Sequence, residues 1–123
     1  MRLSIAPETF ALFMSDSGTE TERVLLSKVS DLKSQILVKG QHYTGVSGSD
    51  AFLDAVVPRL IIATSTQFPE RERIRDEWAE QLRARGIKLF RQDETGAVEL
   101  EFFRNEWRAR AYLTGEIFRS TSR

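Results

Sequence analysis

The chain has 123 residues, with 18 Lys and Arg balanced by 18 Asp and Glu, one His and no Cys. This length suits one compact domain, and the neutral balance excludes a global attraction to nucleic acid or to an anionic membrane. The lack of cysteine excludes disulfides and thiolate metal sites, and no apolar run approaches the roughly 20 residues of a membrane helix. We expect one domain over residues 1–119, a polar tail over 120–123, and a cytoplasmic location for the chain by itself.

The first 34 residues are predicted to form two strands and a helix. Alternation over residues 2–5 and a dense apolar run over 9–14 each predict a strand, and turn residues at 15–18 follow the second. Residues 19–22 have the Ser/Thr-x-x-Glu pattern of a capping box and therefore predict the start of a helix. The apolar face expected of this helix consists of Val24, Leu25, Val29 and Leu32.

Two further strands flank a short helix. Apolar runs predict strands over residues 35–39 and 60–63, and a loop of small and polar residues extends from Gly40 to Ser49. Ser49 is expected to cap the short helix, because serine accepts hydrogen bonds from the first backbone amides of a helix. The residues that this helix is expected to bury, before Pro58 ends it, are Phe52, Leu53 and Val56.

The clearest predicted element is a helix from Pro69 to Arg85. Its apolar residues Ile74, Trp78 and Leu82 recur at i, i+4 and i+8, and Gly86 follows as a natural C-terminal cap. The remaining positions carry charges of both signs, which is typical of a solvated face.

The last third of the chain is predicted to form strands. We expect a strand over residues 87–90, a turn over 93–96, and a hairpin with alternating strands over 97–103 and 107–113. Opposite charges are expected to face each other across this hairpin: Glu99 and Glu101 on one strand, Arg108 and Arg110 on the other. Helices between strands favour parallel pairing and hairpins favour antiparallel pairing, so the predicted fold is α/β, a mixed β-sheet with helices packed on it.

Polar side chains follow two of the predicted buried strands. Asp16 comes after the strand at residues 9–14, and His42, the one histidine of the chain, comes after the strand at 35–39. In open α/β sheets ligand sites gather at the carboxyl ends of strands, so this pair predicts a metal or phosphate site. The spacing leaves the structural alternative open, in which the aspartate caps a helix and the histidine belongs to an ordinary loop.

Two other binding chemistries stay open. The loop from Gly40 to Ser49, with Gln41, Tyr43 and Thr44, can cradle an anion through backbone amides, although it lacks the sequence of a nucleotide P-loop. Trp107 is surrounded by arginines in the sequence, a composition that nucleic-acid contacts share with ordinary alternating hairpins. Those arginines are Arg104, Arg108 and Arg110.

Residues 2–100 resemble the C-terminal half of the metallo-β-lactamase-fold domain found in the ComEC family of DNA-uptake proteins. The similar segments come in the family's order: Phe13–Asp16 for a strand that ends in Thr-Gly-Asp, Ile36–Thr44 for a strand that runs into His-His-Gly-Ser, Ser49–Arg59 for a helix, and Gly86–Val98 for the closing strands. The resemblance implies half of an αββα sandwich. It also implies that Asp16 matches a metal-binding aspartate and that His42 matches one of two paired histidines.

The same resemblance implies a depleted metal site. The family's His-x-His-x-Asp-His cluster belongs to its N-terminal half and has no counterpart in this sequence. The paired histidines correspond to Gln41-His42, and a later Gly-His-Pro corresponds to Gln67-Phe68-Pro69. Catalytic zinc takes about three protein ligands and leaves one position for water. Zinc binding is therefore expected only with additional ligands.

Three functional hypotheses follow. The first is a ligand-depleted or fragmentary relative of the ComEC-type domain that is not catalytic alone. The second is a metal-dependent hydrolase or nuclease acting on DNA, completed by an N-terminal half that carries the histidine-rich segment. The third is a non-enzymatic interaction module, because half of a two-sheet sandwich exposes an apolar sheet face that favours a homo-oligomer or pairing with the missing half.

Overall fold

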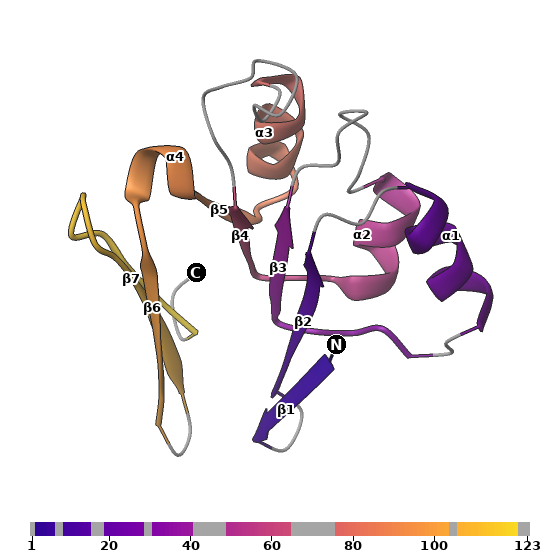
Figure 1. Cartoon of the computed structure of the whole chain (residues 1–123), viewed down its shortest axis with the longest axis horizontal. Coiled ribbons are helices and arrows are strands. Elements are labelled where there is room, and N and C mark those ends of the chain that lie inside the picture. The colour runs from indigo at the N-terminus through magenta and orange to yellow at the C-terminus, as the bar shows by residue number, and fades with distance from the viewer. Residues whose placement is uncertain are drawn as a thin grey trace.

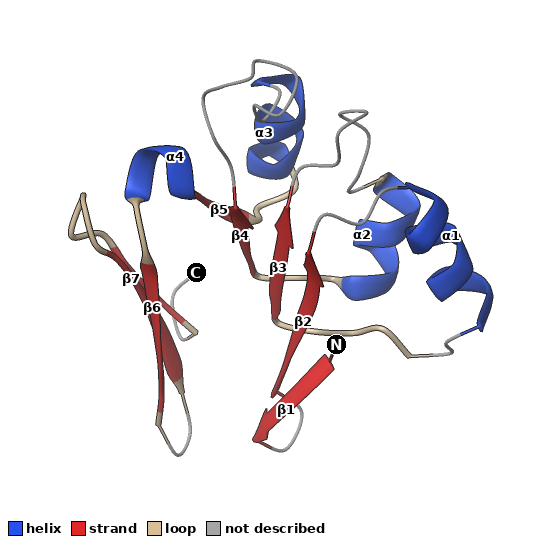
Figure 2. Ribbon diagram, viewed as in Figure 1, coloured by secondary structure: helices blue, strands red, loops and turns tan. Residues whose placement is uncertain are grey.

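The computed structural model of the chain describes residues 2–6, 9–15, 19–28, 31–40, 49–64, 76–103 and 106–120. These residues form three layers, with helices on one side, a five-stranded sheet in the middle and a three-stranded sheet on the other side (Figure 1 and Figure 2). The predicted α/β fold with a mixed sheet is confirmed. The predicted hairpin near the C-terminus belongs to a second sheet of its own, which the sequence interpretation did not separate from the first.

The central sheet, named sheet A, has the strand order β1-β2-β3-β4-β5. Its strands are β1 (Arg2–Ala6), β2 (Thr9–Ser15), β3 (Ile36–Gly40), β4 (Leu60–Thr64) and β5 (Lys88–Arg91). β1 is antiparallel to β2, whereas β2, β3, β4 and β5 are parallel. The carboxyl ends of four strands therefore lie at one edge of the sheet, which is called the carboxyl edge below.

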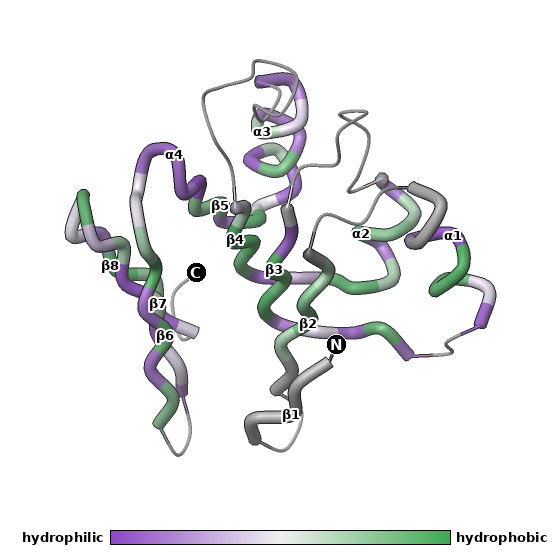
Figure 3. The backbone as a smooth tube through the Cα atoms, in the orientation of Figure 1, coloured by the Kyte–Doolittle hydropathy of each residue, from purple (hydrophilic) through white to green (hydrophobic). Residues whose placement is uncertain are grey.

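Three helices cover one face of sheet A: α1 (Thr19–Lys28), α2 (Asp50–Val56) and α3 (Asp76–Ala84). Figure 3 shows hydrophobic residues along the middle strands and along the helical segments that approach them. The buried side chains between helices and sheet are Leu12, Met14, Leu32, Leu37, Phe52, Leu53, Val56, Ile61 and Leu82. Burial of these apolar groups is the main force that holds the helical layer to the sheet.

The ends of α2 and α3 follow from local chemistry. Ser49 caps α2 as predicted, and its hydroxyl accepts a hydrogen bond of 3.3 Å from the Phe52 amide. Val57 ends α2 in a left-handed conformation (φ 49°), which a β-branched residue rarely adopts. Gly86 ends α3 at φ 75°, and the amides of Gly86 and Ile87 bond the carbonyls of Arg83 and Leu82 in the Schellman pattern.

Two predictions about helices need correction. The face predicted for the first helix is wrong in part, because Val24 is 47% exposed and the buried Leu32 lies beyond the end of α1. Val29 and the predicted helical segment from Pro69 to Arg75 lie outside the described residues. The turn predicted at 93–96 is instead one helical turn, α4 (Gln92–Thr95), in which the Thr95 hydroxyl donates to the Arg91 carbonyl at 3.0 Å.

The second sheet, named sheet B, consists of β6 (Val98–Phe102), β7 (Trp107–Ala111) and β8 (Ile117–Arg119), all antiparallel. The predicted pairing of opposite charges between β6 and β7 is confirmed. Glu99 forms an ion pair with Arg110 at 3.2 Å, and Glu101 forms one with Arg108 at 2.9 Å. β8 was not predicted. The second hairpin strand ends at Ala111, earlier than predicted, because the chain turns there to enter β8 and leaves Leu113 exposed.

Sheet B packs on the face of sheet A that the helices leave free. The buried residues between the two sheets are Ala11, Ile36, Leu60, Ile62, Phe90, Trp107, Ala109 and Ala111. The expectation of an exposed apolar sheet face, as in half of a two-sheet sandwich, needs correction, because the chain's own C-terminal strands pack on that face of sheet A.

The last described residue, Ser120, forms hydrogen bonds with two other segments of the chain. Ser120, which we assigned to the polar tail, donates its amide to the Trp107 carbonyl at 2.8 Å, and its carbonyl accepts from the Arg59 guanidinium. Residues 121–123 of the predicted tail lie outside the described residues. No helix in the described part of the chain has both the length and the apolar character needed to cross a membrane.

Candidate functional site at the carboxyl edge

The two strands that precede the predicted site residues end side by side. In the parallel pair β2 and β3, Ser15 lies opposite Lys39, and in the next pair Gly40 lies opposite Thr64. Asp16 follows β2 directly in the sequence, and the segment Gln41, His42, Tyr43 and Thr44 follows β3. These five residues lie outside the described residues, so their side-chain geometry stays a prediction. The fold brings together the strand ends from which they extend.

The loop after β3 has a firm anchor at its far end. Glu22 of α1 is 2% exposed, and its carboxylate accepts hydrogen bonds from both the amide and the hydroxyl of Ser49, each at 3.2 Å. Ser49 in turn caps α2. Glu22 therefore links α1 to Ser49, the first described residue after Gly40. The sequence interpretation saw Glu22 only as part of a capping box.

A buried lysine stands at the near end of the same loop. Lys39 is 3% exposed, its ammonium donates to the Gly40 carbonyl at 3.0 Å, and it lies 4.8 Å from the centroid of the Trp78 ring. A buried ammonium requires hydrogen bonds or an aromatic face to offset the loss of water. Lys39 was not predicted as a site residue, although a lysine inside a predicted buried strand is a signal that could have identified it.

The end of β5 carries a further charged group. Arg91 bonds the Asp93 carboxylate at 3.0 and 3.3 Å, and the Asp93 side chain is 1% exposed. Arg91 also lies 3.7 Å from Glu94 and 3.9 Å from Asp76. These carboxylates belong to α4 and α3. Arg91 therefore holds α4 at the carboxyl edge of sheet A and close to α3.

The described residues do not supply a catalytic metal site. They contain no group of three or more His, Cys, Asp or Glu side chains that could hold a metal ion. The sequence offers one histidine and no cysteine, and that histidine is His42. Asp16 and His42 together provide two protein ligands, one fewer than catalytic zinc usually takes. The donor set therefore does not fit the dinuclear centre of the family that the sequence resembles.

The structure favours an ordinary hairpin over nucleic-acid contact at Trp107, the two alternatives that the sequence left open. Trp107 is 2% exposed, and its indole N–H donates to the Gln35 side chain at 2.7 Å. A ring enclosed between two sheets offers no face on which a base could stack. Arg108 is occupied by Glu101 through two hydrogen bonds of 3.1 and 2.9 Å, which lower the pKa of Glu101 and raise that of Arg108. Arg104 lies outside the described residues.

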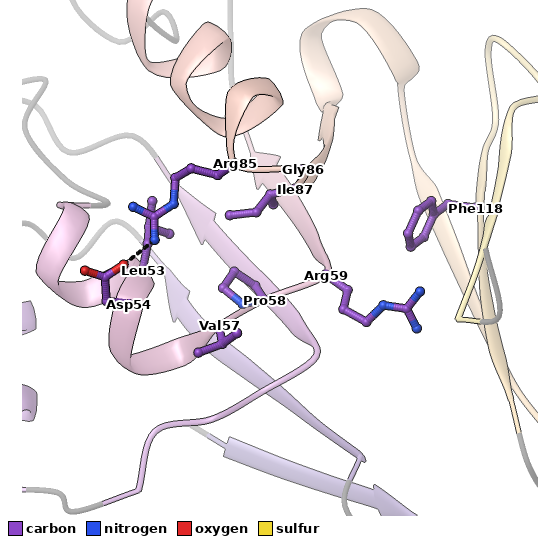
Figure 4. Close-up of a pocket in the computed structure, with 9 residues that line it drawn as sticks. All are labelled: Leu53, Asp54, Val57, Pro58, Arg59, Arg85, Gly86, Ile87 and Phe118. Atoms are coloured by element: carbon purple, nitrogen blue, oxygen red, sulfur yellow. Dashed lines mark hydrogen bonds and ion pairs between the residues drawn. The ribbon is translucent and has the colours of Figure 1, made fainter. Parts of the chain in front are cut away.

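A cavity of about 310 Å³ lies at the opposite end of sheet A, where β4 and β5 begin (Figure 4). Apolar residues such as Pro58 and Phe118 line it, and two arginines project from its walls. Arg85 turns toward Asp54, with which it forms an ion pair, and Arg59 bonds the carbonyl of Ser120. Both guanidinium groups are thus engaged within the chain, and the cavity is separate from the carboxyl edge.

The comparisons with known proteins give one relative. The chain is 36% identical over 89 residues to "Competence protein ComA" of Neisseria gonorrhoeae. The match covers 72% of this chain and 13% of the relative, so the chain spans about an eighth of the length of the curated protein that it matches. No protein-family model and no solved structure matches the chain. The chain is therefore related to a segment of a competence protein.

Proposed function

We propose that the chain is a metallo-β-lactamase-type domain of the ComEC kind, that it acts in DNA uptake, and that it is not catalytic by itself. The observation that supports this proposal is the combination of adjacent strand ends with few metal-binding side chains. β2 and β3 end side by side before Asp16 and His42, while the sequence contains one histidine and no cysteine. The relationship to a competence protein supports the link to DNA uptake.

The chemistry of the donor set supports a role without catalysis. Two protein ligands hold zinc weakly, and a hydrolytic zinc centre also needs a fixed geometry that leaves room for water. The described part of the carboxyl edge uses its charged groups for structure instead. Glu22 holds Ser49, and Arg91 holds Asp93. This arrangement suits a domain that binds or scaffolds.

A hydrolysis assay tests the proposal. The purified chain is incubated with fluorescently labelled single-stranded DNA and with zinc, manganese or magnesium, each with and without chelator. Asp16→Asn and His42→Ala serve as matched controls that remove the two candidate ligands. We expect no metal-dependent cleavage above the level of either variant. Robust turnover that chelator abolishes, and that either substitution removes, would overturn the proposal.

The alternative is a metal-dependent nuclease completed by a further protein segment. Its specific support is the adjacency of the β2 and β3 ends, because that geometry suits two ligands of one ion. In this case Asp16 and His42 bind metal and the missing histidines come from another segment. Adding a purified segment with a His-x-His-x-Asp-His sequence should then create cleavage activity that Asp16→Asn abolishes. No gain of activity would count against the alternative.

A further inference from the structure

The two sheets of the sandwich differ in width. Sheet A has five strands and sheet B has three among the described residues. One side of the sandwich is closed, since Lys88 of β5 pairs with Glu116 next to β8, and Arg59 before β4 bonds Ser120 after β8. β8 therefore lies over the β5 side of sheet A. β6, at the other edge of sheet B, faces the side toward β2, where sheet A continues beyond it.

Burial between the sheets is lower toward the carboxyl ends of β2 and β3 and along β6. Ala11 of β2 and Ile36 of β3 are at most 1% exposed, whereas Phe13 and Val38, two residues farther along the same strands, are half-buried. In sheet B the inward residues of β7 are buried, whereas Val98 and Leu100 of β6 are half-buried and Phe102 is 40% exposed. This gradient shows that the apolar interior reaches the surface along β6.

β6 also offers backbone groups at this open side. The amide of Phe103 bonds the Glu106 carbonyl, and the Ala97 carbonyl accepts from Tyr112, so odd-numbered residues of β6 point their backbone groups toward β7. In an antiparallel pair the intervening residues direct their amides and carbonyls to the opposite side. Val98, Leu100 and Phe102 therefore present backbone hydrogen-bonding groups at the outer edge of β6, and no described strand pairs there.

The outward charges of β6 indicate what kind of strand fits this edge. Glu99 and Glu101 point away from the core, and Glu99 keeps 61% of its side chain exposed although it pairs with Arg110. If a second copy paired antiparallel through its own β6, centred on Leu100 or on either glutamate, each register would set glutamate opposite glutamate, which is unfavourable. A neighbouring strand with lysine or arginine opposite the exposed Glu99 would instead be attracted.

We propose that the outer edge of β6 binds an extended polypeptide segment with apolar residues on its inner face and basic residues on its outer face. The segment adds a fourth strand to sheet B and covers Phe102, Val38 and Phe13. Its backbone bonds supply affinity, and the alternating side chains supply specificity. This proposal does not depend on metal binding or on the function proposed for the carboxyl edge.

A peptide titration tests this interface. The probe is a fluorescein-labelled, end-capped peptide that alternates isoleucine or valine with lysine or arginine, and fluorescence anisotropy measures its binding to the full chain. The control peptide carries glutamate at every basic position. We expect saturable binding of the basic peptide and at least tenfold weaker binding of the acidic one. Equal binding of both peptides, or no binding of either, would overturn the proposal.

Adjacent phenylalanines provide matched variants of the protein. Phe102 and Phe103 are 40% and 46% exposed but lie on opposite faces of sheet B, and Phe103 contacts Arg108 on the outer face. Phe102→Ala should weaken binding of the basic peptide about tenfold, and Phe103→Ala should change it less than threefold. Glu99→Lys should also weaken it. The proposal is overturned if Phe103→Ala weakens binding as much as Phe102→Ala. It is also overturned if β6 variants alter a concentration-dependent dimer seen by ultracentrifugation, because the outer edge of β6 would then bind a second copy of the chain.

Discussion

At the residue scale, two buried charged side chains shape the region around the loop at 41–48. Glu22 and Lys39 lie at its two ends, and each directs its charged group to backbone or hydroxyl partners. Burying a charged group is costly unless it is paired or hydrogen-bonded, so such residues stay only where their partners are fixed. The positions of Gly40 and Ser49 thus depend on two side chains whose burial was not predicted from the sequence.

Substitution of Glu22 tests the anchor at Ser49. Glu22→Gln should lower the free energy of unfolding by about 1–3 kcal/mol, because a neutral amide replaces the charged acceptor of two hydrogen bonds. Chemical denaturation followed by circular dichroism measures the change. Glu80→Gln, in an exposed pair with Arg83, is the control and should change stability by less than about 0.5 kcal/mol. Equal effects of the two substitutions would show that Glu22 is not an anchor.

The pairing of Glu101 and Arg108 predicts a dependence of stability on pH. The hydrogen bonds from Arg108 lower the pKa of Glu101 in the folded chain, so folding favours the ionised carboxylate. The resulting stabilisation is present above the ordinary pKa of glutamate and is lost as the pH falls through the lowered pKa of the folded state. Glu101→Gln should flatten the loss of stability at acid pH, measured by thermal melts between neutral and strongly acid buffers. An unchanged acid profile in this variant would contradict the role given to the pair.

At the element scale, the ends of α2 and α3 follow closely from the sequence, and the buried face of the first helix does not. Ser49 and Gly86 act as predicted because capping depends on chemistry within one turn. The apolar face of α1 was predicted incorrectly, since the buried Leu32 lies beyond the end of the helix and Val24 is 47% exposed. β8 was missed because three residues of mixed polarity become a strand only when β7 is beside them.

The end of α2 offers a stabilising substitution. Val57 is 59% exposed and sits at φ 49°, where a side chain with a Cβ is strained and little apolar packing is present to be lost. Val57→Gly should therefore stabilise the chain by about 1 kcal/mol, as the left-handed conformation costs a non-glycine residue about 1–2 kcal/mol. Thermal denaturation provides the measurement, with Ala55→Gly inside the same helix as a destabilising control. A lower melting temperature for Val57→Gly would mean that Val57 contributes packing that outweighs its strain.

At the scale of the whole molecule, the second sheet decides how the domain is built. Trp107 fills the space between the sheets and bonds Gln35 just before β3, so it joins the C-terminal strands to the parallel sheet. The terminal hairpin and its facing glutamates and arginines were predicted from the sequence. The sheet on which this hairpin packs was not predicted. Alternation shows which residues share a face, but it does not show which other sheet that face meets.

Removal of the Trp107 ring should destabilise both sheets together. Trp107→Ala should lower the free energy of unfolding by about 3–5 kcal/mol, as expected when a large buried aromatic side chain is deleted. Trp107→Phe keeps part of the packing and loses the bond to Gln35, so its effect should be smaller. Urea denaturation, followed by circular dichroism and by the fluorescence of Trp78, should show one shared transition for each protein. Separate transitions would indicate that the sheets fold independently.

The neighbouring strand ends at the candidate site were predictable, whereas the site formed by Asp16 and His42 stays a prediction. The order of strands placed Asp16 and His42 at neighbouring strand ends, and the parallel register of β2 and β3 agrees with that position. The ion pairs and hydrogen bonds of the surrounding charged side chains were not predictable from the sequence. That information depends on contacts between distant segments, such as Glu22 with Ser49.

Zinc titration is the measurement that tests the proposed depletion of the metal site most directly. Isothermal titration calorimetry of the full chain, with the double variant Asp16→Asn, His42→Ala as control, gives the number of ions and their affinity. We expect at most one zinc ion per chain. Its dissociation constant should exceed about 1 μM, which corresponds to a binding free energy weaker than about −8 kcal/mol. This binding should be lost in the double variant. Two tightly bound zinc ions per chain, both lost in the double variant, would contradict the proposal that this domain lacks a catalytic metal centre of its own.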